Sequence, residues 1–263
     1  MVKLARISIV VAVMGLAGIA AIGVARAGDM PVKAKAPPPP VAYDWSGVYV
    51  GFSVGGMWVD VDRRFFNPVV PPFDFSTATT DGVWDVHGGA QVQWGNWVLG
   101  FEAGLTHCFR ECRATALVPT TTIYGEHKVT DLFTVGPRLG FAWDRWMIYG
   151  TGGYANATLK AAYCVTGGVG LNCSPTNGTV GPGQSRNDGW FAGGGFEYMV
   201  HKGALVDVTL GAEYQHWDVS STRAFCLAPA CNSIFDYDLG AKGDIVRARL
   251  TIKTQGYGWW GTP

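Results

Sequence analysis

The feature that most constrains this chain is a two-residue alternation of bulky apolar residues with small or polar ones, repeated along eight segments. Successive side chains of a β-strand point to opposite faces, so each segment is expected to form a strand with two chemically different faces. A helical period is not established in this part of the chain. The predicted strands span residues 46–59, 84–94, 97–107, 128–142, 146–156, 188–199, 204–217 and 243–254.

The links between these strands alternate strictly between short and long. Gly95-Asn96, "WDRW" and "HKG" form the short links, and the long loops lie at about residues 60–83, 108–127, 157–187 and 218–242. An up-and-down transmembrane barrel has tight periplasmic turns at one end and long outer loops at the other. The chain is therefore predicted to be all-β, an eight-stranded antiparallel up-and-down transmembrane β-barrel.

Side-chain size indicates which face of each strand is turned inward. In residues 46–59 the bulky face carries Val50, Phe52 and Val54, whereas the other face carries Ser53 and glycines. An eight-stranded barrel has room inside for small side chains and a few paired polar groups, so the bulky face is expected to meet lipid. The alternative is a soluble periplasmic carrier of the lipocalin type, which would bury that face.

Tryptophans lie at or just beyond the ends of the predicted strands, as in the two aromatic girdles of a membrane barrel. The girdle predicted at the short-turn end contains Trp45, Trp94, Trp97, Trp143, Trp146, Trp259 and Trp260. The girdle predicted at the long-loop end contains Trp58, Trp84, Trp190 and Trp217.

The N-terminal residues predict export. Residues 1–27 combine a positive start, "MVKLAR", with an apolar run and the small-residue ending "ARA", the layout of a signal peptide. The apolar run is long enough that an uncleaved membrane anchor is the alternative. Residues 28–44 include four consecutive prolines and are expected to form an extended periplasmic tether, whose lysines are candidates for contact with the cell wall. The barrel is then expected to span residues 45–263.

The six cysteines fall in three of the predicted long loops, one pair in each. In an oxidising compartment this grouping favours disulfides within the loops. The expected pairs are Cys108 with Cys112, Cys164 with Cys173, and Cys226 with Cys231. A metal site at "HCFREC" is the alternative, but the remaining histidines show no ligand spacing, so no metal is expected.

Six charged residues fall on the inward phase of their predicted strands: Glu102, Arg138, Glu197, Glu213, Arg247 and Arg249. Unpaired charges in a dry lumen are costly, so these residues are expected to form hydrogen-bonded ion pairs that fill the barrel. A narrow ion path or a gate is the alternative use of the same residues.

Catalysis, cofactors and nucleic acid are not expected. Lys+Arg 20 against Asp+Glu 20 provides no basic face for nucleic acid. His216 with Ser220 and Ser221, and Asp218 nearby, is the one local candidate for a Ser/His/acid set, but no oxyanion glycine motif accompanies it. Phosphate-cradling loops are missing from the sequence.

Two stretches, "KAPPPPVAYDWSGVYVGFSVG" and "TDLFTVGPRLGFAWDRWMIYGTGGYANA", resemble the small outer-membrane β-barrel proteins of alphaproteobacteria, the Brucella-type major outer-membrane proteins and their rhizobial porin-family relatives. The later stretches "GWFAGGGFEYMV" and "IVRARLTIKT" resemble the same family. This resemblance implies an eight-stranded barrel placed in the outer membrane by the barrel-insertion machinery. It also implies roles in envelope integrity and surface antigenicity, with hemin binding in some members. Pro137 departs from the family pattern and predicts a local bulge.

The combined prediction is a monomeric, non-enzymatic protein of the Gram-negative outer membrane that supports envelope structure and presents disulfide-stapled surface loops. Outer-membrane lipid and lipopolysaccharide are its expected surroundings. A surface protein that binds hemin or another ligand, and a narrow porin, are the alternatives.

Overall fold

The structure, a computed structural model, describes residues 43–66, 73–117, 123–165, 179–203, 205–223, 225–226 and 236–254. The predicted signal peptide, nearly all of the predicted tether, Trp259 and Trp260 lie outside the described residues.

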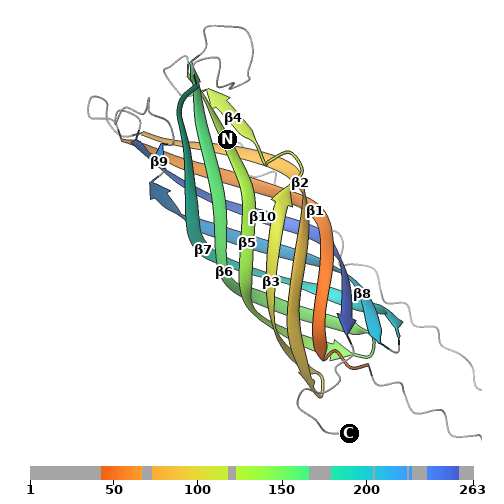
Figure 1. The fold of residues 1–263 in the computed structure, drawn as a ribbon. Helices are drawn as coiled ribbons and strands as arrows, with labels where there is room; N and C mark the ends of the chain where they lie inside the picture. The colour runs from red at the N-terminus through yellow and green to blue at the C-terminus, as the bar shows by residue number, and fades with distance from the viewer. Residues whose placement is uncertain are drawn as a thin grey trace, which may run out of the picture. The chain divides into compact units, whose positions relative to one another are not determined.

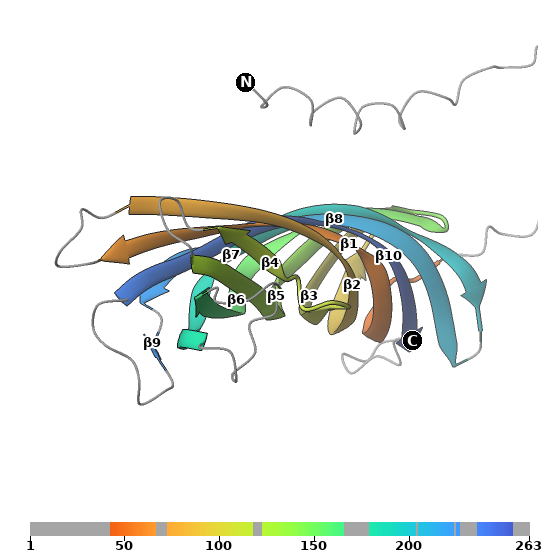
Figure 2. The same ribbon diagram turned by 90° about the horizontal axis from the view of Figure 1, so that it is seen from above.

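Eight long strands form a closed antiparallel ring, shown from the side in Figure 1 and from above in Figure 2. The ring follows the order β3-β2-β1-β10-β8-β7-β6-β5, and pairing of β3 with β5 closes it. The predicted eight-stranded up-and-down barrel is thus confirmed. The long strands are β1 (Gly47–Phe66), β2 (Phe73–Trp94), β3 (Trp97–Cys108), β5 (Ile123–Trp143), β6 (Trp146–Val165), β7 (Thr179–Lys202), β8 (Val206–Arg223) and β10 (Asp236–Thr254).

Two short strands lie beside the ring at its long-loop end. β4 (Ala114–Leu117) pairs with β5, and β9 (Phe225–Cys226) pairs with β7. At the opposite end, tight turns join consecutive strands. Gly95 (φ 58°) and Asp144 (φ 52°) adopt the left-handed conformation that two-residue hairpin turns require.

The strands continue further than the sequence predicted at the long-loop end. Most of residues 60–83 belongs to β1 and β2, and the ends of the other predicted loops, at 108–127, 157–187 and 218–242, likewise belong to strands. The predicted loop bounds are therefore wrong. Outside a membrane the backbone still needs hydrogen-bond partners, and pairing with the next strand supplies them.

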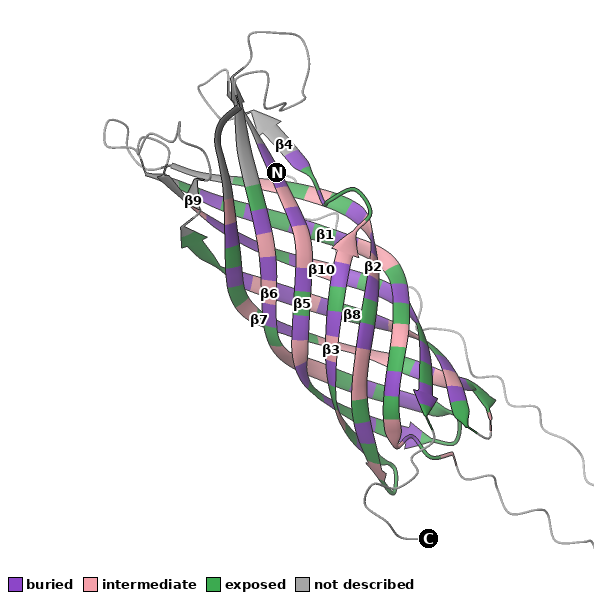
Figure 3. Ribbon diagram, in the orientation of Figure 1, coloured by how far each residue is buried: buried purple, intermediate pink, exposed green. Residues whose placement is uncertain are grey.

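The two faces of each strand exchange their chemistry part of the way along the barrel. On β1 the outward side chains are Val50, Phe52 and Trp58 and then, without a change of phase, Asp60 and Asp62, all exposed. The inward side chains change in the opposite sense, from the polar Ser53 to the apolar Met57, Val59 and Val61, all buried. Figure 3 shows the regular alternation of buried and exposed residues along the strands.

This exchange divides the barrel into two parts. In the part toward the short turns, the bulky apolar face points outward, as predicted, because it meets lipid. In the part toward the long-loop end, the apolar face points inward and forms a core, as in a water-soluble barrel. That outer core contains Met57, Val59, Val61, Val83, Cys112, Val129, Leu132, Ala155, Ala157, Leu159, Phe191, Trp217, Val219, Leu239, Ala241 and Ile245.

The girdle predictions are correct in exposure for seven tryptophans and wrong for two. The exposed or partly exposed ones are Trp58, Trp84, Trp94, Trp97, Trp143, Trp146 and Trp190. Trp45 and Trp217 are 0% exposed and lie inside the barrel, so neither belongs to a girdle. Trp217 has the inward phase of β8, and Trp45 precedes β1 and packs with Val98, Met147 and Met199. A tryptophan at a strand end lies at the height of a membrane interface, but its place in the two-residue alternation decides whether its ring points outward or inward.

The bulge predicted at Pro137 is also wrong. The pairing of β5 with β6 passes from Val135↔Tyr154 to Arg138↔Thr151 without a register shift, and the irregularity in this ladder lies between Val129 and Asp131. The Thr151 hydroxyl donates a hydrogen bond to the Pro137 carbonyl at 3.1 Å, close to where the proline lacks an N–H donor.

In the part of the chain that the structure describes, no helix has the length and apolar character needed to cross a membrane.

The outer core predicts that two neighbouring residues of β6 differ in their contribution to the free energy of unfolding. Leu159 is buried in the outer core, whereas Thr158 points outward. Leu159→Ala is expected to lower the free energy of unfolding by about 2–5 kcal/mol because it leaves a cavity. Thr158→Ala, the matched control, is expected to change it by less than about 0.5 kcal/mol. Denaturant unfolding of the protein in detergent micelles measures both. Equal effects would contradict an inward apolar face at this level.

Candidate functional site

The structure brings the six predicted interior charges into one buried layer. Glu102 projects from β3, Arg138 from β5, Glu197 from β7 and Glu213 from β8, while Arg247 and Arg249 project from β10. Inward phase on five different strands places them opposite one another across a narrow bore. We call these six residues the ionic layer.

Arg249 occupies the centre of the ionic layer. Its guanidinium nitrogens lie 2.6 Å from a Glu102 oxygen and 2.5 Å from a Glu213 oxygen, and its Nε lies 3.8 Å from Glu197. A guanidinium presents five donors in a plane and can therefore serve several carboxylates at once. Arg249 thus connects β10 with β3, β7 and β8 through side chains alone.

The other two arginines extend the layer to either side. Arg138 contacts Glu197 at 2.5 Å and Glu102 at 3.4 Å. Arg247 contacts Glu213 at 2.5 Å. Each of the three glutamates therefore has at least two arginine contacts, and this is the arrangement that compensates the desolvation of buried charges.

The sequence analysis missed several uncharged and charged partners of this layer. The Tyr49 and Tyr149 hydroxyls donate to Glu102 (2.9 Å) and Glu213 (2.7 Å), and the Arg138 guanidinium carbon lies 3.6 Å from the centre of the Tyr149 ring. Asp85 contacts Arg247 at 3.2 Å. Tyr49, Tyr149 and Asp85 also lie on the inward phase of their strands, so the same two-residue alternation identifies them as lumen residues.

A buried group beside the ionic layer has the donor pattern of a hydrolytic triad. His87 Nδ1 lies 2.9 Å from Asp85, and His87 Nε2 lies 3.2 Å from the Thr251 hydroxyl. Asp85 and His87 are 0% and 1% exposed, and Thr251 is 3% exposed. A substrate cannot reach a hydroxyl enclosed in this way, so the group satisfies buried polar atoms.

The predicted alternative at His216 is not assembled as a catalytic set. His216 Nδ1 contacts Asp244 of β10 at 2.8 Å, and its ring lies 5.5 Å from that of Trp190. Ser220 is four residues further along the same strand, which corresponds to about 13 Å. The serine is too distant to be activated by this imidazole.

Apolar layers lie on both sides of the ionic layer. The outer core lies on its long-loop side, as described above. On the short-turn side, Trp45, Val98, Met147 and Met199 form a second buried cluster, which we call the inner cap. The backbone of Trp45 is held there, because its N–H donates to Gln93 at 2.8 Å and its carbonyl accepts from Gln91 at 2.7 Å.

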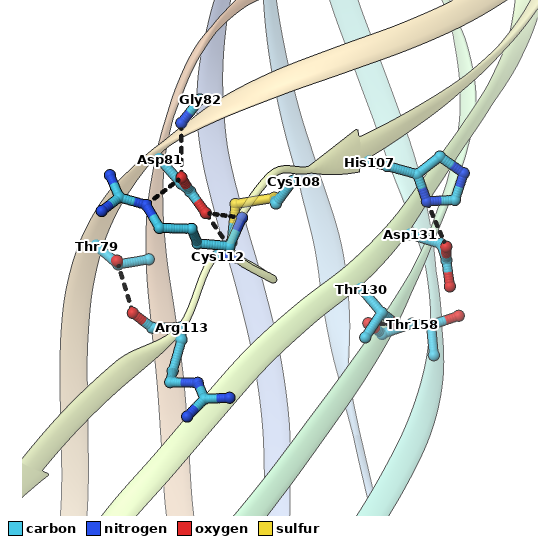
Figure 4. The surroundings of a disulfide bond; sticks show 11 residues. Thr79, Asp81, Gly82, His107, Cys108, Cys112, Arg113, Thr130, Asp131 and Thr158 are labelled. Atoms are coloured by element: carbon cyan, nitrogen blue, oxygen red, sulfur yellow. Dashed lines mark hydrogen bonds and ion pairs between the residues drawn. A yellow bond between two sulfur atoms is a disulfide. The ribbon is translucent and has the colours of Figure 1, made fainter. Parts of the chain in front are cut away.

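The Cys108–Cys112 disulfide closes a small turn at the long-loop end, as Figure 4 shows. The two Cα atoms are 5.5 Å apart, and Glu111 and Cys112 have positive φ angles of 61° and 41°. The buried Asp81 carboxylate accepts backbone N–H groups from Gly82 (2.8 Å), Arg110 (2.9 Å) and Cys112 (3.2 Å). This predicted disulfide is confirmed.

The other two predicted disulfides involve cysteines whose side chains lie outside the described part of the structure. Cys164 lies in β6 and Cys226 in β9, but the structure describes only their backbone. Cys173 and Cys231 lie outside the described residues, so both pairings stay predictions. Asp81, Cys108 and Cys112 offer three potential metal ligands within 4.8 Å of one another. The two sulfur atoms are bonded to each other, however, and a disulfide lacks the thiolates that a metal needs.

A surface cavity of about 600 Å³ adjoins the stapled turn. Its lining consists of Thr79, Thr80, Asp81, Phe109, Arg110, Glu111 and Arg113. Phe109 is 62% exposed even though it lies outside the lipid-facing part of the barrel. Hydrogen bonds from Lys128 and then Arg113 lower the pKa of Glu111 below its usual value, so this rim residue remains an anion at neutral pH.

Known proteins provide further comparisons. The family model described as "Outer membrane protein beta-barrel domain" matches residues 15–242. The 31 kDa outer-membrane immunogenic protein of Brucella melitensis biotype 1 is 27% identical over 228 residues, which covers 78% of this chain and 85% of that protein. The protein of the same description from Brucella suis biovar 1 has the same identity and coverage.

Among solved structures, the outer membrane protein OprG from Pseudomonas aeruginosa has a TM-score of 0.42 at 9% identity, covering 78% of this chain and 96% of that chain. The outer membrane protease OmpT from Escherichia coli has a TM-score of 0.41 at 9% identity, covering 79% of this chain and 96% of that chain.

The ionic layer predicts a large penalty for losing its central cation. Arg249→Ala would leave Glu102 and Glu213 partly uncompensated, so the free energy of unfolding is expected to fall by about 3–5 kcal/mol. Lys242→Ala removes a partner of an exposed pair, 4.0 Å from Asp62 on β1, and is expected to cost less than about 1 kcal/mol. Thermal unfolding in micelles compares the two. If both variants matched the wild type, the ionic layer would have no role in stability.

Proposed function

This chain belongs to the outer membrane protein β-barrel domain family, and we propose that it acts as a non-conducting structural barrel of the envelope that presents a rigid turn at the cell surface. The family match and the Brucella relatives confirm the predicted resemblance and the outer-membrane location. Outer-membrane lipid is accordingly the surrounding of its apolar band.

One observation carries this proposal: the lumen of the described barrel contains three successive layers of buried side chains. The inner cap and the outer core are apolar, and the ionic layer between them has short contacts around Arg249. A hydrated ion would have to pass the buried apolar side chains of both clusters and disrupt buried ion pairs, which include Lys253 with Asp207 at 3.0 Å on the short-turn side. Both steps are costly, because charges leave water and paired carboxylates lose their partners.

Contacts at the short-turn end support the proposed orientation. Lys253 Nζ donates to the carbonyls of Asp44 and Ser46 at 2.9 Å each, and Arg145 Nε donates to the Tyr43 hydroxyl at 2.7 Å. The chain therefore enters the barrel among its tight turns, the end that faces the periplasm in such barrels. Residues 28–44 would then extend into the periplasm after removal of residues 1–27, within reach of the cell wall.

The proposal has further parts, which extend the family resemblance. The protein is monomeric and non-enzymatic, it is inserted by the barrel-insertion machinery, and lipopolysaccharide surrounds its outer half. The buried state of the His87 group and the separation of His216 from Ser220 support the absence of catalysis.

Conductance measurements test the proposed closed lumen. The protein is expected to give no unitary conductance in planar bilayers and no solute flux in liposomes, because both apolar layers exclude water. Gly104 points into the lumen beside Asp85 and Thr134, so Gly104→Trp would obstruct any path that existed. Conductance by the wild type that disappears in this variant would establish the narrow porin instead.

The surface cavity favours a second candidate function, ligand binding. The stapled turn holds Phe109 and Arg110 in a fixed geometry, and rigid loops lose less entropy when they bind. Hemin is the probe that the family resemblance suggests. In this case, Cys108→Ser combined with Cys112→Ser should weaken hemin binding by roughly thirtyfold, the equivalent of about 2 kcal/mol of loop ordering. The readout is an absorbance titration, and an unchanged Kd would exclude the turn from the binding site.

A further inference from the structure

The surface cavity beside the stapled turn lies between two elements of the long-loop end. Thr79, Thr80 and Asp81 of β2 line one side, and the turn at residues 109–113 lines the other (Figure 4). Asp81 is three residues beyond Trp84 of the girdle, so at about 3.3 Å per residue and a tilt of about 40° it lies roughly 8 Å further from the hydrocarbon. A ligand of this cavity therefore comes from the aqueous side.

The charged groups of the cavity balance one another. Three cations and three carboxylates form ion pairs in and around it: Arg110, Arg113 and Lys128, with Asp81, Glu111 and Glu126. Arg110 lies 3.5 Å from Asp81, and Arg113 lies 3.0 Å from Glu111. An anionic ligand would be attracted by the arginines and repelled by the carboxylates beside them, and a cationic ligand would meet the reverse. This balance favours a ligand that is polar but uncharged.

An aromatic ring has a defined position at the edge of the cavity. Phe109 is 62% exposed, and its backbone N–H donates to the Gly82 carbonyl at 2.9 Å. Gly82 leaves room for the ring, because a Cβ atom at this position would lie 2.8 Å from Phe109 Cδ2. The ring therefore packs against the backbone of β2 and presents its remaining surface to water. A ring held in this way offers a flat apolar surface that loses little entropy on binding.

Groups that form hydrogen bonds lie beside the ring and remain accessible. The Arg110 side chain is 86% exposed and approaches Asp81 through Nε, so its terminal N–H groups face water. Arg113 and Lys128 both contact Oε2 of the half-exposed Glu111, which leaves acceptor capacity at Oε1. A guanidinium presents paired donors in one plane, and a carboxylate presents acceptors. Adjacent hydroxyl groups donate and accept at once, so a polyhydroxy ligand matches both groups.

We propose that this cavity binds an uncharged saccharide. The apolar C–H groups on one side of a pyranose ring would pack on Phe109, while its adjacent hydroxyl groups exchange hydrogen bonds with Arg110 and Glu111. A volume of about 600 Å³ lies within the range of about 300–1,000 Å³ for small-molecule sites and accommodates a short oligosaccharide. This inference rests on ligand binding at the cavity, the second candidate function above, and names the class of ligand.

Saturation-transfer NMR of the full chain in detergent micelles tests the proposal. The probes are uncharged trisaccharides of glucose, galactose, mannose and N-acetylglucosamine, together with uncharged oligosaccharides released from the cell's own envelope. At least one probe is expected to bind with a Kd below about 10 mM. Saturation should be strongest at the C–H protons on one side of a sugar ring, because these protons contact Phe109. The absence of binding by every probe would overturn the proposal. The probe that binds most tightly distinguishes a foreign glycan from one on the same cell.

Two variants test the position of the ring. Phe109→Ala removes the ring and is expected to raise the Kd by about fivefold to tenfold. Gly82→Ala keeps every hydrogen-bonding group but displaces the ring, so it should raise the Kd by a similar factor. The control Leu205→Ala removes an exposed apolar side chain at the short-turn end and should match wild type. Equal Kd values for wild type and Phe109→Ala would overturn the proposal. Heat-modifiable mobility verifies that each variant forms the closed barrel.

The absence of charge on the ligand is tested separately. Uronic-acid trisaccharides have the same rings as the uncharged probes but carry carboxylates, and they should bind no more tightly. Raising the salt concentration from about 0.05 to 0.5 M should leave the Kd of an uncharged probe unchanged, because screening acts between charged partners. Tighter binding of the acidic probes that weakens with salt would overturn the assignment to an uncharged saccharide.

Hemin distinguishes failure of this inference from failure of the ligand-binding function. Hemin binding that depends on the disulfide, without binding of any saccharide, would refute the saccharide and retain the cavity as a binding site. If neither hemin nor any saccharide bound, both proposals would be refuted. Displacement of hemin by an uncharged trisaccharide would support both.

Discussion

Closure of the strand ring is the constraint on which the other features depend. An open strand edge in hydrocarbon leaves N–H and C=O groups without partners, at a cost of several kcal/mol for each group. The ladder between β3 and β5, from Trp97↔Phe141 to His107↔Asp131, removes that edge. The same closure sets a narrow bore, which buried side chains from every strand of the ring occupy. The contents of the lumen therefore follow from the geometry of the ring.

Within this bore, polar and apolar layers have complementary roles. The ionic layer joins strands that are not neighbours in the ring, since Arg249 on β10 contacts carboxylates on β3 and β7. The charged side chains are buried between the apolar layers, and a low local dielectric strengthens the attraction between them. A one-residue slip of any strand would turn its charged side chains toward lipid, so the layer also fixes the register of the ladder.

The sequence was sufficient to predict the ring, the short turns and the interior charges, because each depends on a local period of two. It was not sufficient for the outer halves of the strands. There Asp60 and Asp62 replace Val50 and Phe52 on the outward face, and Val59 and Val61 replace Ser53 on the inward face. The two-residue alternation continues there, but the apolar face is now the inward one. An outward apolar face therefore identifies only the part of each strand on the short-turn side of the girdle. Trp45 and Trp217 were assigned to the wrong face for a related reason, since a strand end can belong to either environment. The contacts of Asp81 with the stapled turn depend on chain proximity that no local pattern records.

The height at which the outward face of the barrel changes from apolar to charged restricts the thickness of the bilayer that fits this protein. On β1 the outward apolar residues extend from Val48 to Trp58, which at a tilt of about 40° corresponds to a band of roughly 25 Å. Sinking the barrel would draw Asp60 into hydrocarbon, and raising it would expose Val48 and Val50 to the aqueous phase. A bilayer with a core of about 30 Å would have to thin around this band, whereas the outer membrane is thinner than average. The protein therefore matches a thin bilayer by its own dimensions.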